Sequence, residues 1–342
     1  MEILFTRYYN KFLRLLRPFH WINVEVTSKC NLKCNMCPRQ SFNVFNQDMT
    51  EDVFMKLAKE FTLFQMVDLT GWGEPLLHPR LFDFVKIVKE KKCIVKFTTN
   101  GVLLDKEKAQ DIIELKIEWV VFSIDSPSEN TYREIRGTDL NRVLENVKNL
   151  SELKKKYKTR YPLIDIAVVI SKKNIEELPE MVRVAKTLNA NRLLVNNVHV
   201  VSKKEDIDIL LYKIDPDQNI DVIKRDNSIK EAKKIASELG VNLNFCFTSF
   251  EPLLLKRCPL NIDKTMFVSW NGNVSPCCDL GHPVPGVISK DEIIKNTELV
   301  FGNVKENTIV EIYNSEKYRE FRKKIKKCIP DECRHCMLIR GV

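Results

Sequence analysis

The sequence has no apolar run long enough to cross a membrane. None of its apolar stretches approaches the roughly 20 residues that a membrane-spanning helix requires, although 44% of its 342 residues are hydrophobic. The basic first 20 residues also lack the small-residue cleavage site of a signal peptide. We therefore expect a globular, cytoplasmic protein. We interpret residues 1–20 as an amphipathic helix that packs on the domain, with a membrane-surface anchor as the alternative.

The sequence also lacks the interleaved basic and aromatic residues that are typical of nucleic-acid-binding surfaces. Its 55 Lys and Arg against 46 Asp and Glu give a net charge of +9, which is spread in short runs such as residues 154–156. Solvent-exposed helix faces explain such runs, and a basic surface can also steer an acidic electron donor or an anionic substrate. We therefore expect no nucleic-acid partner.

The cysteines do not fit a disulfide framework, because there are 11 of them and a reducing compartment favours metal-binding or catalytic roles. Cys93 and Cys246 lie in apolar runs, and we expect them to be buried free thiols. Cys30, Cys34 and Cys37 instead form a C-x3-C-x2-C triplet. A structural zinc site uses four ligands, whereas three thiolates without a local fourth ligand suit an iron–sulfur cluster with one open iron.

Six strand-like segments alternate with helical patterns in the first 200 residues. Their nearly continuous apolar character is typical of strands covered on both faces of a parallel sheet. Thr50 predicts a helix N-cap before an apolar helical stripe. Six strand–helix units fall short of the eight in a closed barrel, so the sequence predicts an α/β fold with a partial (β/α)6 barrel over residues 21–245. The predicted strands are 22–26, 66–72, 94–100, 119–125, 163–170 and 192–200.

Residues 246–342 differ from this pattern and form a small cysteine-rich domain. A hairpin is predicted around residues 271–272 (Asn-Gly), and a long charged helix over about 308–327. Cys278 is expected to point away from Cys277, because successive side chains of an extended chain alternate. The cysteines of this part are Cys258, Cys277, Cys278, Cys328, Cys333 and Cys336.

Polar or glycine-rich segments follow the first four predicted strands, where a parallel sheet carries its functional loops. The cysteine triplet follows the first strand and GWGEP (71–75) follows the second. Thr-Asn-Gly (99–101) ends the third strand, and SIDS (123–126) ends the fourth, with Arg136 shortly after. We expect a cofactor site at this edge of the sheet.

The order of these motifs resembles the radical S-adenosylmethionine (SAM) superfamily over about residues 20–200. The resemblance implies a [4Fe–4S] cluster held by Cys30, Cys34 and Cys37, whose open iron is chelated by exchangeable SAM. Two departures are Trp72, where the family often has glycine, and Met36, where an aromatic residue often precedes the third cysteine.

The same resemblance implies further cofactor-binding residues. Gly73 and Glu74 would meet the methionine amino group of SAM, and Ser123, Asp125 and Arg136 are candidates for its ribose and carboxylate. Asn100 is a further cofactor-binding candidate. Alternatives are a helix cap for Glu74, a strand end for Ser123 and Asp125, and a surface salt bridge for Arg136. His78 is interpreted as a turn or packing residue.

The later cysteines, spaced C-x13-G-x4-C and then C-x2-C, resemble the twitch or SPASM extension of radical SAM enzymes. Full SPASM domains hold two auxiliary clusters with about seven cysteines, and six thiols cannot supply four ligands to each of two clusters. We therefore expect one auxiliary [4Fe–4S] cluster, with Cys328 as a reserve ligand and a four-cysteine zinc site as the alternative. The expected ligands are Cys258, Cys277, Cys333 and Cys336.

The resemblance implies that a low-potential electron donor such as ferredoxin drives reductive cleavage of SAM. The resulting 5′-deoxyadenosyl radical would abstract hydrogen from a substrate. The chain also resembles archaeal proteins that modify the pterin cofactor of tungsten-containing aldehyde oxidoreductases, which favours a small-molecule cofactor precursor as substrate. A peptide or protein maturase is the alternative, and a non-catalytic zinc-binding protein is the alternative of another class.

Overall fold

Most of the predicted N-terminal helix lies outside the residues that the structure describes. None of the described residues 16–20 is helical, and Phe19 and His20 belong instead to the first strand, β1 (Phe19–Val24), so the helix prediction is wrong for these five residues. Their backbone pairs on both sides, since Phe19 is in register with Phe64 and the amide of His20 donates to the carbonyl of Lys264. The computed structural model describes residues 16–42, 46–215, 217–252, 258–294 and 298–342.

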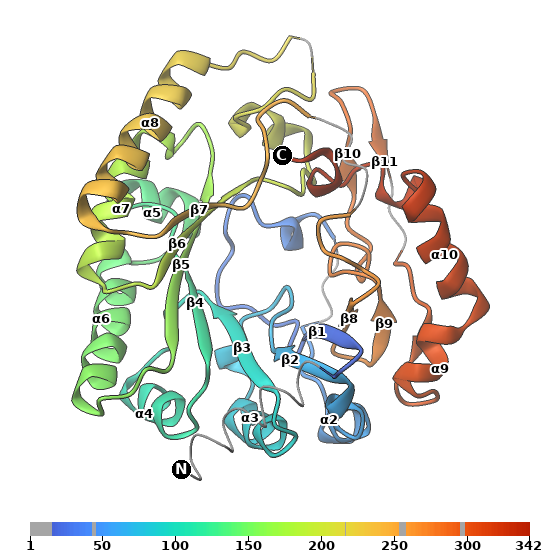
Figure 1. The fold of residues 1–342 in the computed structure, drawn as a ribbon. Helices are drawn as coiled ribbons and strands as arrows, with labels where there is room; N and C mark the ends of the chain where they lie inside the picture. Colours follow the sequence, from blue (N-terminus) through green and yellow to red (C-terminus); the bar gives the residue numbers. More distant parts are fainter. Residues whose placement is uncertain (1–15, 43–45, 216, 253–257, 295–297) are drawn as a thin grey trace.

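A curved, mostly parallel sheet of ten strands forms the centre of the molecule (Figure 1). The order is β12-β9-β8-β1-β2-β3-β4-β5-β6-β7, so the first seven strands are neighbours in chain order. The six predicted strands are all present, most with trimmed ends, and a short seventh strand follows. These strands are β1, β2 (Phe64–Asp68), β3 (Ile94–Thr99), β4 (Trp119–Ser123), β5 (Leu163–Ile170), β6 (Arg192–Asn197) and β7 (Leu243–Phe245).

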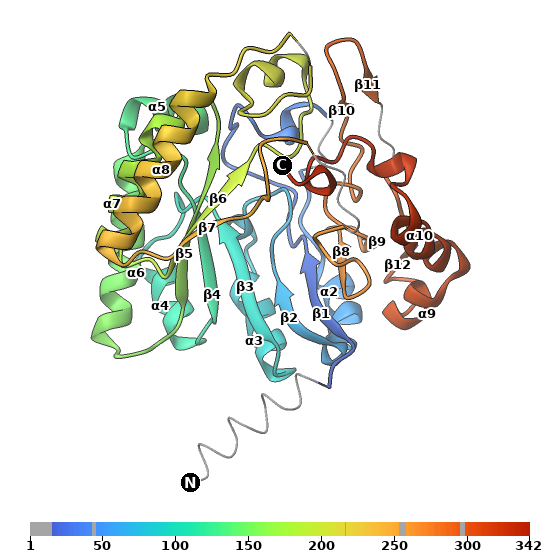
Figure 2. The same ribbon diagram turned by 45° about the horizontal axis from the view of Figure 1, so that its top comes forward.

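Helices cover the outer face of this sheet (Figures 1 and 2). The predicted cap is confirmed, because the hydroxyl of Thr50 accepts a hydrogen bond from the amide of Val53. The apolar stripe of the next helix, which includes Leu81 and Phe84, is fully buried, and burying each such side chain contributes about 1.5–3 kcal/mol. The helices are α2 (Glu51–Ala58), α3 (Leu81–Glu90), α4 (Lys106–Glu114), α5 (Glu129–Arg136), α6 (Leu140–Lys156), α7 (Leu178–Thr187) and α8 (Val222–Leu239).

The cysteine-rich part extends the same sheet beyond β1. Strand β8 (Thr265–Val268) pairs parallel to β1, and β9 (Asn273–Ser275) returns antiparallel, which confirms the predicted hairpin. Strand β12 (Gly302–Asn303) pairs with β9, while β10 (Gly286–Val287) and β11 (Ile293–Ile294) form a separate pair. The barrel sheet and the cysteine-rich segment are therefore hydrogen-bonded to each other.

The predicted long helix over 308–327 is two helices, α9 (Ile309–Asn314) and α10 (Glu316–Lys327). Ser315 separates them with an extended backbone, and its hydroxyl caps α10 by accepting from the amide of Tyr318. The capping preference of serine thus overrides the continuous charged pattern.

The last residues of the chain return to the segments that follow β6 and β7 (Figure 2). The carbonyl of Gly341 accepts hydrogen bonds from the amides of Thr248 and Ser249, and Met337 donates to the carbonyl of His199. Cys93 is buried as expected, but Cys246 is exposed, because it follows the short edge strand β7. The boundary between residues 245 and 246 falls at the end of β7 and stays a prediction.

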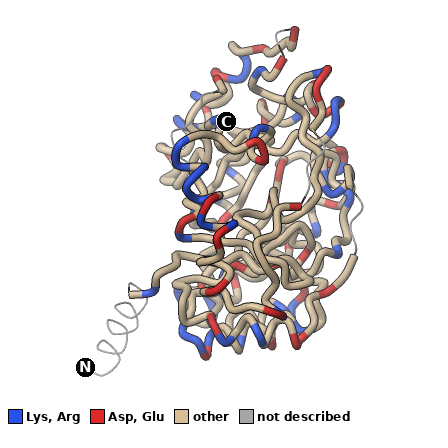
Figure 3. The backbone as a smooth tube through the Cα atoms, turned by 90° about the vertical axis from the view of Figure 1, so that its right-hand side faces the viewer, with Lys and Arg blue, Asp and Glu red and all other residues tan. Residues whose placement is uncertain are grey.

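Figure 3 shows lysines and arginines interspersed with acidic residues over one side of the molecule. None of the described helices is both long and apolar enough to cross a membrane.

Candidate cofactor sites

A cavity of about 250 Å³ lies at the carboxyl ends of the parallel strands. Loops after β1, β2, β3 and β4 line it, as the motif order predicts, and so do the end of β6 and the residues that follow it. Of the predicted site residues, all three cysteines of the triplet reach this cavity together with five others, and Asp125 does not. These five are Gly73, Glu74, Asn100, Ser123 and Arg136.

The cysteine loop is held in place by local turns and by helix α5. The amide of Cys37 donates to the carbonyl of Cys34, and the amide of Asn35 donates to the carbonyl of Ile135 at 2.9 Å. Burial raises the pKa of the Cys30 thiol and raises that of Cys37 to about 11. Both thiols are therefore neutral at pH 7 without metal, and iron binding must release their protons.

The GWGEP loop runs directly against the end of β1. A Cβ atom on Gly73 would lie 2.1 Å from the carbonyl oxygen of Thr27, and one on Gly71 would lie 2.3 Å from Cγ of Glu25. Only glycine fits at either position, because backbone and a buried side chain occupy the space. The amide of Glu74 then donates to the carbonyl of Lys29 at 2.7 Å, which fixes the loop beside the cysteine triplet.

Glu74 is buried and its carboxylate is fully engaged within the protein. One oxygen accepts from the amide of Leu76 at 3.1 Å and from the hydroxyl of Thr99 at 2.7 Å, and the other accepts from the amide of Asn100 at 2.7 Å. Burial raises the pKa of Glu74, and these hydrogen bonds oppose that rise. Glu74 is the N-cap of the short 3-10 helix Pro75–Leu77, so the capping alternative is correct, and a contact of Glu74 with SAM stays a prediction.

Asn100 connects the loop after β3 to the cysteine loop. Its amide nitrogen donates to the side-chain oxygen of Asn31 at 2.9 Å, between the first two cysteines of the triplet. Its own oxygen accepts from the amide of Val102 at 3.0 Å. Asn100 therefore helps to hold the cysteine loop in position at the cavity.

Asp125 does not line the cavity, but it forms an ion pair with Arg136, which does. Its side chain is 1% exposed, bonds the guanidinium of Arg136 and accepts from the amide of Val169 at 2.8 Å. Burial alone would lower the pKa of Arg136, but the Asp125 carboxylate, together with Cys34 and Tyr132, raises the pKa above its ordinary value. Arg136 also approaches the sulfur of Cys34 at 3.8 Å, so the pair is buried beside the triplet and is not a surface salt bridge.

Asn197, at the end of β6, is a cavity residue that the sequence did not single out. It is 3% exposed, and neither atom of its amide group has a hydrogen-bond partner within the described part of the chain. An unpaired buried polar group costs about 1–3 kcal/mol, so a polar group of a bound cofactor or substrate fits this position. The only signal in the sequence is a pair of asparagines in an otherwise apolar strand.

A second cavity brings together the four cysteines that the spacing favoured as auxiliary ligands. Cys258, Cys277, Cys333 and Cys336 line it among apolar side chains, and neither Cys278 nor Cys328 does. Cys278 instead lies 3.4 Å from the carboxylate of Asp279. Cys328 is exposed at the end of α10.

These four thiols are neutral without metal. Burial above all, and then the neighbouring Cys258, raise the pKa of Cys333 to about 12. Burial and the charge of Asp279 likewise raise the pKa values of Cys277 and Cys336.

Asp279 and His335 also line the second cavity, and sequence reasoning missed both. The sequence indicates them only by position, because Asp279 directly follows Cys277 and Cys278 and His335 lies inside the last C-x2-C. Among the described residues, no three His, Cys, Asp or Glu are grouped to hold a single metal ion. A tetrahedral zinc ion that lies 2.3 Å from each sulfur requires the sulfurs to be about 3.8 Å apart. An iron–sulfur cluster does not require this short separation, because its thiolates bind different irons.

Comparison with known proteins agrees with this geometry. The protein-family model of the radical SAM superfamily matches residues 24–185, and that of SPASM, an iron–sulfur cluster-binding domain, matches residues 258–337. The chain is 31% identical over 322 residues to the tungsten-containing aldehyde ferredoxin oxidoreductase cofactor-modifying protein of Pyrococcus furiosus, covering 93% of this chain and 87% of the relative. It is 26% identical to a probable GTP 3′,8-cyclase of Methanocaldococcus jannaschii, over 61% of this chain and 67% of that one.

Solved structures share the fold. Streptococcus suis SuiB superposes with a TM-score of 0.67 at 18% identity, covering 95% of this chain and 72% of SuiB. The structure of anSMEcpe with bound AdoMet superposes with a TM-score of 0.65 at 20% identity, covering 94% of this chain and 85% of anSMEcpe. The family matches and the 31% identity to the Pyrococcus furiosus relative confirm the predicted resemblance. This chain belongs to the radical SAM superfamily and carries a SPASM iron–sulfur cluster-binding domain at its C-terminal end.

Proposed function

We propose that this radical SAM enzyme modifies the pterin cofactor of a tungsten-containing aldehyde oxidoreductase and acts on a small-molecule precursor of that cofactor. The observation that carries the proposal is the 31% identity to a protein named for this activity, which extends over 93% of this chain and 87% of the relative. The match therefore includes both the barrel and the cysteine-rich part.

Membership of the superfamily implies a [4Fe–4S] cluster and SAM, and the cavity at the strand ends fits them. Cys30, Cys34 and Cys37 line one side of it, while the unpartnered amide of Asn197 supplies hydrogen-bonding atoms. When both groups are bound, reductive cleavage of SAM supplies a 5′-deoxyadenosyl radical for hydrogen abstraction. Arg136, held charged by Asp125, would place a positive charge beside the triplet and favour an anionic group such as the SAM carboxylate.

The protein's own residues position and shield this chemistry. Glu74 holds the GWGEP loop to the loop after β3, so the backbone of Gly73 keeps a fixed place at the cavity wall. Apolar side chains, including Leu32 and Val198, complete the lining and limit the access of water. Ser123 lines the same cavity and remains our candidate for the SAM ribose.

The SPASM match implies auxiliary iron–sulfur binding, and we assign one [4Fe–4S] cluster to the second cavity. Four cysteines around a single cavity support this number, because each four-iron cluster of this kind uses up to four thiolates. The proposal includes a low-potential electron donor such as ferredoxin, a cytoplasmic location and a domain boundary at residues 245–246.

The test is substrate-dependent hydrogen transfer under anaerobic conditions. Reconstituted enzyme, SAM and a strong reductant are incubated with deuterated tungsten-pterin precursor, and 5′-deoxyadenosine is analysed by mass spectrometry. We expect deuterium in the 5′-deoxyadenosine and a modified pterin. The triple variant Cys30→Ala/Cys34→Ala/Cys37→Ala should produce neither and should keep about four of about eight irons.

Two results would contradict the proposal. If deuterium appears only with a peptide substrate, the peptide-maturase alternative is correct. Zinc instead of iron at both cavities, in protein made anaerobically with ample iron, would contradict the enzyme assignment as a whole.

A further inference from the structure

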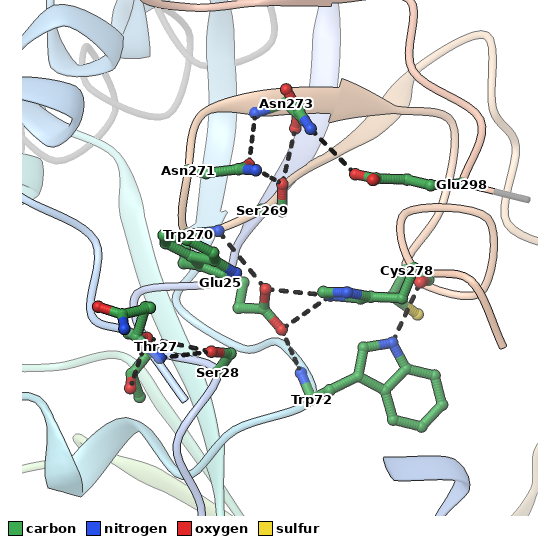
Figure 4. Close-up of polar contacts among 12 residues, drawn as sticks. Glu25, Thr27, Ser28, Trp72, Ser269, Trp270, Asn271, Asn273, Cys278 and Glu298 are labelled. Carbon is green, nitrogen blue, oxygen red and sulfur yellow. Dashed lines mark hydrogen bonds and ion pairs between the residues drawn. The ribbon is translucent and has the colours of Figure 1, made fainter. Parts of the chain in front are cut away.

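A buried carboxylate joins three segments that surround the two cavities. Glu25, directly after β1, is 0% exposed. It accepts a hydrogen bond from the backbone amide of Trp72 at 2.9 Å (Figure 4), and it meets Nε2 of His282 at 3.0 and 3.1 Å. The amide of Trp270, in the turn of the β8–β9 hairpin, approaches the same carboxylate at 3.4 Å.

Trp72 contacts both this carboxylate and the auxiliary-cysteine segment. Its indole Nε1–H donates to the backbone carbonyl of Cys278 at 3.1 Å, as Figure 4 shows. Trp72 also lines the first cavity, whereas Cys277, the neighbour of Cys278, lines the second. A single side chain therefore connects the walls of the two cavities.

The GWGEP loop can transmit a shift of Trp72 to the first cavity. Gly71 and Gly73 on either side of Trp72 pack without space for a Cβ atom against Glu25 and Thr27. Glu74 follows and is bonded to the loop after β3. Because these contacts leave little room for adjustment, a displacement of Trp72 has to move the Gly73 backbone.

Metal binding in the second cavity would act on the segment that Trp72 contacts. Cluster assembly orders the segment that carries its ligands, and this segment includes the acceptor of the Trp72 indole. We propose that Trp72, held by Glu25, couples the two cofactor sites, so that the filled auxiliary site increases the affinity of the first cavity for SAM. Trp72 is thus a positioning residue, and the inference rests on the two-site assignment proposed above.

The size of the effect follows from the single indole hydrogen bond. A neutral hydrogen bond changes an equilibrium constant by roughly two- to tenfold, and coupling between two binding sites is reciprocal. The auxiliary cluster should therefore strengthen SAM binding by about two- to tenfold, and SAM should by the same factor favour retention of the auxiliary iron.

The experiment is a double-mutant cycle on SAM affinity, measured by anaerobic equilibrium dialysis. Cys333→Ala removes the auxiliary cluster, and Trp72→Phe removes the indole donor while keeping an aromatic ring. We expect Cys333→Ala to weaken SAM binding two- to tenfold in the wild-type background and less than twofold in the Trp72→Phe background. Trp119→Phe is the matched control, because it deletes an indole donor to Asp165 at the opposite ends of the strands and should leave the effect of Cys333→Ala unchanged.

Equal losses in both backgrounds, or no loss in either, would overturn the inference. A wild-type protein that binds no SAM would instead contradict the proposed function, so the two failures are distinguishable. If Cys333→Ala does not fold, the reciprocal measurement uses intact cysteines. SAM should then slow the loss of auxiliary iron to a chelator in the wild type but not in Trp72→Phe, and equal protection in both proteins would also refute the coupling.

Discussion

Replacing Glu74 by Gln tests how the GWGEP loop is held. The carboxylate accepts from Leu76 and Thr99 on one oxygen and from Asn100 on the other. A glutamine has only one acceptor oxygen, so in either orientation its NH₂ group faces a backbone N–H. At least one buried amide loses its partner, and the negative charge is lost.

The magnitude follows from these contacts. A hydrogen bond to a charged group contributes about 1.5–3 kcal/mol, and we expect the free energy of unfolding to fall by that amount. With an unfolding entropy of roughly 0.7 kcal/mol/K for a chain of this length, Tm should fall by roughly 2–4 °C. If Glu74 also sets the site of the SAM amino group, the dissociation constant of SAM should rise by about tenfold or more.

The assays are thermal unfolding by circular dichroism and equilibrium dialysis of SAM, with iron content measured in parallel. Glu60→Gln is the matched control, because the Glu60 carboxylate accepts from one backbone amide, that of Ile309, and a glutamine oxygen can replace it. An unchanged Tm would refute the assigned hydrogen bonds. An unchanged SAM affinity with an intact cluster would remove Glu74 from the SAM site.

Three further predictions concern other residues. Asn197→Ala should weaken SAM or substrate binding by about 5- to 150-fold without lowering Tm, because its amide has no partner among the described residues; a lower Tm with unchanged affinity would contradict its role. Cys258→Ala should lose about four irons and Cys278→Ala none, as measured by iron analysis, because Cys258 lines the second cavity and Cys278 does not. Burial lowers the pKa of His78, so its neutral form stabilises the fold above the ordinary pKa near 6.5 and this stability is lost as the pH falls. Tm should therefore fall less between pH 7 and pH 5 in His78→Asn than in the wild type, while the exposed control His20→Asn should follow the wild type.

Residues that act through local spacing were predictable from the sequence. The triplet Cys30, Cys34 and Cys37 lies within eight positions, and the GWGEP loop carries its glycines beside Glu74. The closeness of the three thiols and the tight packing of the loop are therefore encoded in adjacent residues. The strands were predictable because burial on both faces demands a continuous apolar run, and Thr50 because capping depends on the next three residues. The break at Ser315 was missed, although its signal is equally local.

The sequence by itself determined the superfamily motifs, the alternation of strands and helices and the four cysteines that suit an auxiliary cluster. Only the tertiary structure placed Asp125 behind the cavity as the partner of Arg136 and brought Asn197 into it. It also joined Glu25 to His282, which is 257 positions away in the chain. Such contacts depend on how strands and loops pack against one another, and nothing in the sequence around a buried carboxylate indicates which distant groups will form hydrogen bonds with it.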